Sequence, residues 1–190
     1  MALVLVGINH STANIEMREK VAFPPEIVES ALAEIYALPP IREVVIVSTC
    51  NRTEIYLDFV ESDSEVPVDD ELAQKRQLAD RQAEVVAWLS KFHNLQASEL
   101  GKCSYSYASE DVVRHLMKVS CGLDSMVLGE PQILGQIKSA YAVSKDQEVV
   151  AQSLGRAFEE AFSIAKQVRT DTAIGENPVS VAYAAVTLAE

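Results

Sequence analysis

The sequence predicts an α+β fold: a ferredoxin-like βαββαβ unit whose antiparallel sheet has helices on one face, followed by additional C-terminal helices. Short β-branched runs alternate with helical patterns in the first half of the chain, whereas the second half has helical periodicity alone. Of the 190 residues, 48% are hydrophobic and 23% are charged. This composition supports a packed core and excludes a disordered chain.

The first two predicted elements are a strand and a helix. Ala2–Ile8 is an almost unbroken aliphatic run, typical of a strand buried on both faces. Pro24-Pro25 favours a helix start, and Pro39-Pro40 favours its end. Between the two proline pairs, apolar residues recur at helical spacing: Ile27, Ala31, Ile35 and Leu38.

Two further strands are predicted on either side of a short polar turn. The first is a second buried run, Val44–Val47. In the second, the apolar residues Ile55, Leu57 and Phe59 alternate with Glu54, Tyr56 and Asp58. This alternation predicts a half-buried strand.

An acidic stretch, Glu61–Glu71, predicts an exposed loop in which Asp69 and Asp70 cap the next helix. That helix is expected to run to about His93. The fourth predicted strand then alternates serines with Cys103, Tyr105 and Tyr107.

The remaining sequence is helical in pattern. Helices are predicted from Ser109 to about Cys121 and from Pro131 to about Ser144. A third helix is marked by apolar residues at helical spacing: Leu154, Phe158, Ala161, Phe162 and Ala165.

The chain is expected to divide into residues 1–150, a ferredoxin-like domain with its trailing helices, and residues 151–190, a helical connector. Asp171–Pro178 predicts a linker, and the pattern becomes helical again from Val179. Because this last pattern has no stop signal, we expect the chain to be part of a longer protein.

Charge, cysteine content and glycine spacing exclude several classes of protein. The net charge of −12 opposes an extended basic surface for nucleic acid or an anionic membrane. No apolar run approaches the ~20 residues of a membrane helix. The three cysteines lack C-x-x-C spacing, so we expect no zinc site or other metal. No basic residue precedes the apolar start Met1–Val6 and no small-residue cleavage site follows it, so we expect a cytoplasmic location. No Gly-x-Gly occurs, so no dinucleotide fingerprint is encoded here.

Cys50 lies in the predicted turn between two strands, where its sulfur would face solvent. The cation of Arg52 and the N–H dipoles of the turn favour the thiolate, the form that attacks carbonyl groups. Cys50 is therefore a candidate nucleophile. An ordinary turn, in which Thr49, Cys50 and Asn51 only satisfy the backbone, explains the same pattern.

His115 falls at the edge of the apolar stripe of its predicted helix. From there its ring could reach a cleft as an acid-base group, or pack in the core, which is the more common outcome for a histidine at such a position. His10 follows the first strand, where sites often lie, but nothing in the sequence assigns it chemistry.

The segment Gly122–Gln132 is a polar turn region that opens into a helix. Pro131 fits the first helical position and Glu130 its cap, so the first turn offers unpaired N–H groups. Gln132 and Gln136 lie four residues apart on one side of the helix, where their amides could bind a polar ligand. A helix start with two surface glutamines explains the same residues.

Two segments, Ser48–Tyr56 and Gly122–Gln136, closely resemble the glutamyl-tRNA reductase family. Gly7–His10 and Asn177–Ala182 fit the same family, and the similarity spans the chain. A lengthened acidic stretch around Glu61–Gln82 is the main departure. The family has a ferredoxin-like catalytic domain, an NADPH-binding domain and a helical dimerisation domain. The resemblance implies that this chain holds the catalytic domain and a connecting helix.

The resemblance implies an oxidoreductase that opens the five-carbon route to tetrapyrroles such as porphyrins. Cys50 would attack the ester of glutamyl-tRNA, and NADPH would reduce the thioester to glutamate-1-semialdehyde. His115 matches the family histidine that assists proton transfer or substrate placement. The family's glutamate-binding positions match Thr49, Asn51, Arg52, Ser125, Glu130, Pro131, Gln132 and Gln136. We expect Arg52 and Glu130 to bind oppositely charged ends of glutamate.

The resemblance also implies partners. These are glutamyl-tRNA as substrate, a homodimer at full length, a downstream aminomutase and no membrane, with NADPH bound outside this chain. Two other interpretations stay open. One is a cysteine hydrolase that uses Cys50 and His115 without NADPH, and the other is a non-catalytic module that binds tRNA or protein.

Overall fold

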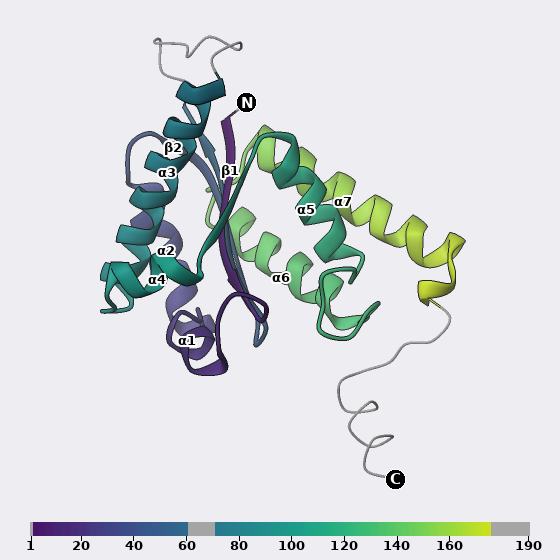
Figure 1. Ribbon diagram of the computed structural model, residues 1–190. Coiled ribbons are helices and arrows are strands. Elements are labelled where there is room, and N and C mark those ends of the chain that lie inside the picture. The colour runs from purple at the N-terminus through teal and green to yellow at the C-terminus, as the bar shows by residue number, and fades with distance from the viewer. Residues whose placement is uncertain (1, 61–70, 176–190) are drawn as a thin grey trace.

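The computed structural model describes residues 2–60 and 71–175 (Figure 1). This part of the chain contains four strands, seven α-helices and one short 3₁₀-helix. In chain order they are β1 (Ala2–Asn9), α1 (Ile15–Lys20), α2 (Pro25–Tyr36), β2 (Ile41–Ser48), β3 (Arg52–Phe59), α3 (Glu71–Phe92), α4 (Ala97–Cys103), β4 (Tyr105–Ala108), α5 (Glu110–Ser120), α6 (Gln132–Asp146), α7 (Gln152–Asp171) and η1 (Ala173–Gly175).

The four strands form one sheet in the order β2-β3-β1-β4, and every neighbouring pair is antiparallel. β1 and β3 pair along their full lengths, from Ala2 opposite Phe59 to Asn9 opposite Arg52. β1 therefore occupies an inner position, as its continuous aliphatic run predicts. The α+β class and the antiparallel sheet are confirmed.

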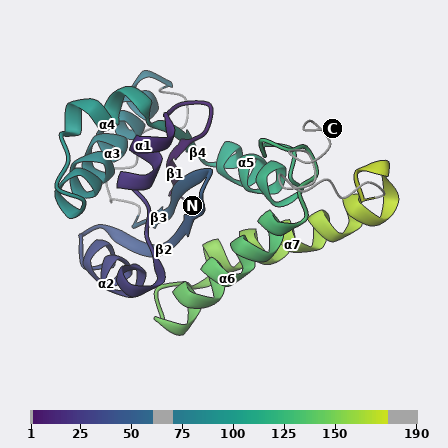
Figure 2. The same cartoon turned by 90° about the horizontal axis from the view of Figure 1, so that it is seen from below.

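One face of the sheet packs against α2, α3 and α4 (Figures 1 and 2). Apolar residues recur on the inner side of these helices because their spacing follows the helical period. The core on this side includes Val4, Val6, Ile8, Leu32, Ile35, Ile46, Ile55, Leu57, Val85, Trp88, Leu89 and Leu100. The prediction that the first two long helices share one face agrees with this packing.

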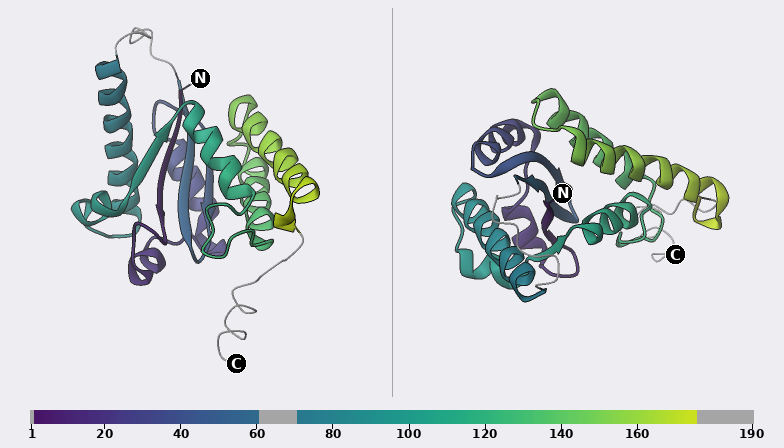
Figure 3. Two further views of the ribbon diagram at one scale, coloured as in Figure 1. Left: turned by 45° about the vertical axis from the view of Figure 1, so that its right-hand side comes forward. Right: turned by 90° about the horizontal axis from the view of Figure 1, so that it is seen from above.

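The opposite face is covered by α5, α6 and α7, which follow the fourth strand (Figure 3). Their core includes Leu5, Val45, Val47, Tyr56, Val112, Leu116, Ile133, Ile137, Leu154 and Phe158. All eight residues of β3 are consequently buried, so the prediction of a half-buried strand is wrong. Its polar residues face protein because hydrogen bonds replace water there.

Two short helices were outside the sequence-based expectations. α1 begins after Asn14, whose side-chain oxygen accepts a hydrogen bond from the N–H of Met17. α4 ends at Cys103, so the prediction that Cys103 belongs to the fourth strand is wrong. β4 contains only Tyr105–Ala108, and helices of six or seven residues are too short for periodicity to show.

Several predictions fall on residues outside the described ranges: the acidic loop with Asp69 and Asp70, the Asn177–Ala182 motif and the helix expected from Val179. α7 packs in the second core, and the division of the chain at residue 150 stays a prediction. Within residues 2–60 and 71–175, no helix has the length and apolar character needed to cross a membrane.

Candidate active site

Cys50 lies in the turn that joins β2 to β3, and its side chain is exposed. Thr49 organises this turn, because its hydroxyl oxygen accepts hydrogen bonds from the N–H groups of Asn51 and Arg52, both at 3.2 Å. The N–H of Thr49 donates to the carbonyl of Arg52 at 2.8 Å. The predicted exposure of Cys50 on a turn is therefore confirmed.

The turn is also tied to the end of β1. The N–H of His10 donates to the carbonyl of Asn51 at 2.9 Å, and Asn9 lies opposite Arg52 in the sheet. Burial, followed by the nearby charge of Arg52, lowers the pKa of His10. The segment Gly7–His10 and the Cys50 turn thus lie together at one end of strands β1 and β3.

Arg52 points inward from this end of β3, and only 1% of it is exposed. Its Nη1 donates to Oε1 of Glu54 at 2.8 Å, and its Nη2 donates to Oδ2 of Asp124 at 3.0 Å and to the Asp124 carbonyl. Burial disfavours its charge, but Glu54 and Asp124 outweigh burial and raise its pKa. Its charge is thus shared between two protein carboxylates, not held free beside Cys50.

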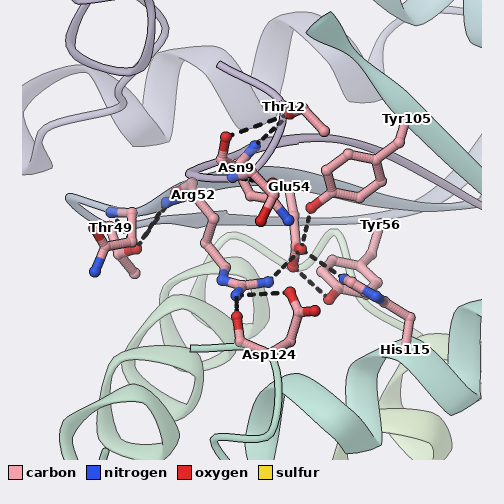
Figure 4. A network of polar contacts seen from close by, with 11 residues as sticks. Asn9, Thr12, Thr49, Arg52, Glu54, Tyr56, Tyr105, His115 and Asp124 are labelled. Carbon is pink, nitrogen blue, oxygen red and sulfur yellow. Dashed lines mark hydrogen bonds and ion pairs between the residues drawn. The ribbon is translucent and has the colours of Figure 1, made fainter. Parts of the chain in front are cut away.

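Glu54 is fully buried and accepts from four side chains (Figure 4). They are Arg52 at 2.8 Å, Tyr105 at 2.6 Å and His115 at 2.7 Å on Oε1, and Tyr56 at 2.7 Å on Oε2. Burial alone would raise the pKa of Glu54, but the hydrogen bond from His115 and the charge of Arg52 lower it to about 2. Glu54 is therefore a carboxylate at neutral pH.

Gly7 makes this arrangement sterically possible. In the sheet, Gly7 lies opposite Glu54 on one side and opposite Tyr105 on the other. A Cβ atom on Gly7 would lie only 2.6 Å from the ring of Tyr105. The phenol thus crosses over β1 at the one residue without a side chain and reaches Glu54.

His115 projects from α5 into the network and is buried, with 6% of its surface exposed. Its ring stacks on Tyr107, with centroids 4.8 Å apart, and lies 5.7 Å from the centroid of Tyr105. Within the described part of the chain, its hydrogen-bond partner is Glu54 and not Cys50. The structure thus places His115 in a buried polar network and not in an apolar core.

The other predicted site residues lie in the loop between α5 and α6 and in the first turns of α6. Gly122 and Gly129 adopt positive φ and bring the loop ends together, with the N–H of Gly129 donating to the carbonyl of Gly122 at 2.9 Å. Arg169 of α7 donates to the Glu130 carbonyl at 2.8 Å. Of the predicted residues here, Ser125 and Glu130 are half-buried, and Pro131, Gln132 and Gln136 are exposed.

One boundary differs from the prediction. α6 begins at Gln132, and Pro131 is the residue before it with helical φ and ψ, so Glu130 is one residue further out than a cap. The α5–α6 loop nonetheless reaches the Cys50 turn, because Asp124 of this loop binds Arg52. In the described ranges, no group of His, Cys, Asp or Glu residues is arranged to hold a metal ion.

A family model described as glutamyl-tRNAGlu reductase, N-terminal domain, matches residues 6–172. The chain belongs to this family. It is 53% identical over 190 residues to the glutamyl-tRNA reductase of Ectopseudomonas mendocina (strain ymp), covering all of this chain and 40% of that protein. It is 51% identical to the glutamyl-tRNA reductase of Marinomonas sp. (strain MWYL1), covering all of this chain and 41% of that one.

A solved structure of glutamyl-tRNA reductase from Methanopyrus kandleri is similar to the whole chain. Its TM-score is 0.73 at 29% identity, over 99% of this chain and 39% of that chain. The chain therefore spans about two-fifths of the length of these glutamyl-tRNA reductases.

Four residues of the network in this glutamyl-tRNA reductase domain were not expected from sequence: Glu54, Tyr56, Tyr105 and Asp124. Periodicity assigns Glu54 and Tyr56 to the exposed side of a strand, because it cannot show that later helices cover that side. One feature of the sequence could have indicated that another group packs against this strand. Gly7 interrupts an aliphatic strand, and a glycine inside a strand often marks a close approach by another group.

Proposed function

We propose that this chain carries the acyl-accepting site of an NADPH-dependent glutamyl-tRNA reductase, which starts the five-carbon route to tetrapyrroles. The observation that carries the proposal is the exposed Cys50 in the turn that leads into Arg52, whose guanidinium joins this turn to the α5–α6 loop. The two segments that resemble the family thus meet at one side chain. The strand order β2-β3-β1-β4 further supports a ferredoxin-like classification.

In the proposed reaction, Sγ of Cys50 attacks the ester carbonyl carbon that joins glutamate to the 3′-terminal ribose of its tRNA. A C–S bond forms, the C–O bond to the ribose breaks, and the thiol proton passes to the ribose oxygen of the departing tRNA. The product is a thioester, which keeps the acyl carbon reactive. An exposed turn suits this step because the end of a tRNA must reach the sulfur.

Glutamate recognition is proposed for residues from both segments: Thr49, Asn51, Arg52, Ser125, Glu130, Pro131, Gln132 and Gln136. Arg52 offers a cation to a carboxylate of glutamate, and Glu130 offers an acceptor to its ammonium group. Because Nη2 of Arg52 already binds Asp124, a substrate carboxylate would share or replace that contact. His115 is proposed to assist proton transfer or substrate placement from its buried position beside Glu54.

NADPH, when bound, supplies the hydride that converts the thioester to glutamate-1-semialdehyde. The described residues do not fit a dinucleotide site, because all their strand pairings are antiparallel and a dinucleotide fold needs adjacent parallel strands. The sequence also lacks Gly-x-Gly. We therefore assign no step of the reduction to these residues and propose that NADPH binds outside this chain.

Four further parts of the proposal concern the protein at full length. Glutamyl-tRNA is the substrate, and the cytoplasm is the compartment. A homodimer and an aminomutase that takes the aldehyde product are proposed as partners. The substrate, the homodimer and the aminomutase rest on the family resemblance alone.

The proposal is tested by mixing the chain with glutamyl-tRNA and measuring its intact mass. We expect one glutamyl adduct, which is absent in Cys50→Ala and present in Cys103→Ala, a matched control because Cys103 is half-buried in α4. No adduct and no released glutamate would contradict the proposal. Continuous release of glutamate without NADPH would favour the hydrolase, and tight binding of uncharged tRNA without an adduct would favour the binding module.

A further inference from the structure

One carboxylate oxygen connects three elements of the candidate site. Oε1 of Glu54, on β3, accepts from Nη1 of Arg52, from the Tyr105 hydroxyl on β4 and from Nε2 of His115 on α5. The three donor-to-acceptor distances lie between 2.6 and 2.8 Å, as expected for hydrogen bonds to an ionised group. Glu54 is therefore the common partner of two residues proposed to act on the substrate (Figure 4).

The charge of Glu54 fixes which nitrogen of His115 holds a proton. An ionised carboxylate has no hydrogen to donate, so a 2.7 Å contact requires that Nε2 of His115 carries the proton. When the ring is neutral, Nδ1 is then the unprotonated nitrogen. Nδ1 has no hydrogen-bond partner among the described residues, so it is the nitrogen that can accept a proton or bind a substrate group.

Glu54 also fixes the guanidinium of Arg52. One edge of the group binds Glu54, which has no exposed surface, and the other binds Asp124, whose side chain is 37% exposed. The buried partner therefore determines the orientation of the guanidinium, while the partly exposed partner lies on the side from which a ligand would come. A planar group held on one edge presents its other edge in a defined direction.

We infer that Glu54 is a positioning residue for glutamyl transfer, which keeps the proton of a neutral His115 ring on Nε2 and aligns Arg52 toward the α5–α6 loop. This inference rests on the proposed function and deepens it. Glu54 touches neither Cys50 nor the substrate, so it acts through its two partners.

A second buried glutamate shows what a purely structural carboxylate does in this fold. Glu43 of β2 is 1% exposed and accepts from the backbone N–H groups at the start of α7, those of Ala151, Ser153 and Leu154. It binds no residue proposed for the site. Glu43→Gln is therefore a matched control for Glu54→Gln, with equal burial and the same change of atoms.

The experiment compares wild type, Glu54→Gln and Glu43→Gln by the rate of Cys50 acylation and by nitrogen NMR of the His115 ring. Glutamine has one acceptor oxygen for three donors, and its NH₂ can face the Tyr56 hydroxyl oxygen, which can accept. We expect Glu54→Gln to slow acylation by about tenfold to a hundredfold, within the range of acid-base contributions. We also expect it to mix the two His115 tautomers, while Glu43→Gln matches wild type in both measurements.

Acylation of Glu54→Gln at the wild-type rate with an unchanged tautomer would overturn the inference. If Glu54→Gln does not fold, the wild-type NMR spectrum still decides, because a ring protonated on Nδ1 and bare on Nε2 is incompatible with the Glu54 contact. The two proposals fail differently. A wild-type chain that is never acylated refutes the proposed function, whereas equal acylation of wild type and Glu54→Gln refutes only the role of Glu54.

Discussion

Tyr105 reaches Glu54 by crossing over β1, and the residue beneath its ring is Gly7. On the same face of β1, Leu3 and Leu5 carry large aliphatic side chains, which suit a buried strand but leave no room for a phenol. Packing densities in protein interiors are high enough that one extra carbon there displaces a neighbour. The Tyr105–Glu54 hydrogen bond therefore depends on the absence of a Cβ atom at position 7 of β1.

At this scale we predict that Gly7→Ala lowers stability by about 1–3 kcal/mol, because its Cβ overlaps the Tyr105 ring. Thermal unfolding measures the loss. Gly135→Ala in α6 is the control, since nothing lies within 4 Å of its added Cβ, and it should be neutral or stabilising by up to ~1 kcal/mol.

A double-mutant cycle tests the cause of that loss. In a Tyr105→Ala background the ring is gone, so Gly7→Ala should cost far less than in the wild type. An equal cost in both backgrounds would show that the glycine is needed for another reason.

At the scale of elements, α7 depends on a strand for its N-terminus. No side chain of its own caps it, and Ala151 precedes its first residue. Oε1 and Oε2 of Glu43 accept from three N–H groups at distances of 2.8–3.0 Å. This contact satisfies backbone donors that would otherwise be buried without partners, and it joins α7 to β2.

We predict that Glu43→Ala destabilises the chain by about 2–4 kcal/mol, because it leaves buried N–H groups unpaired. Glu43→Gln should cost less, since its amide oxygen still accepts. Urea unfolding gives both values. The cap has no structural importance if Glu43→Ala unfolds at the same urea concentration as Glu29→Ala, a change on the exposed side of α2.

At the scale of the whole molecule, the sheet lies between two layers of helices, and this buries the carboxylates of Glu43, Glu54 and Asp58. Each has cationic or N–H partners: Asp58 pairs with Arg42, for example. A buried carboxylate whose pKa is lowered on folding, as in Glu54, contributes to stability only while it is ionised. The fold should therefore be sensitive to acid.

Glu54 sets the range of pH for this sensitivity. Its pKa is lowered from 4.5 to about 2, so its contribution is complete above about pH 4.5 and is lost as pH falls toward 2. Linkage gives a total of about 3 kcal/mol. Urea unfolding at a series of pH values should show wild-type stability falling more steeply with acid than that of Glu54→Gln. Parallel curves would mean that folding does not lower the pKa of Glu54.

Local sequence was sufficient for several features. The aliphatic runs of β1 and β2, the prolines that flank α2 and the polar turn with an exposed Cys50 all depend on residues close together in the chain. The motifs around Cys50 and Gly122 also indicated the family that the comparison found. Such features are predictable because strand, helix and turn preferences act over a few residues.

The tertiary structure alone decided the second helical layer, and with it the burial of Glu54 and Tyr56. Alternation along β3 is the same whether water or α5–α7 covers its polar side, so periodicity predicts a half-buried strand in either case. The contacts of Arg52 with Asp124, and of Glu54 with His115, join residues 72 and 61 positions apart. Only the packing of the two layers brings these charges together, because contacts at that separation leave no pattern in local sequence.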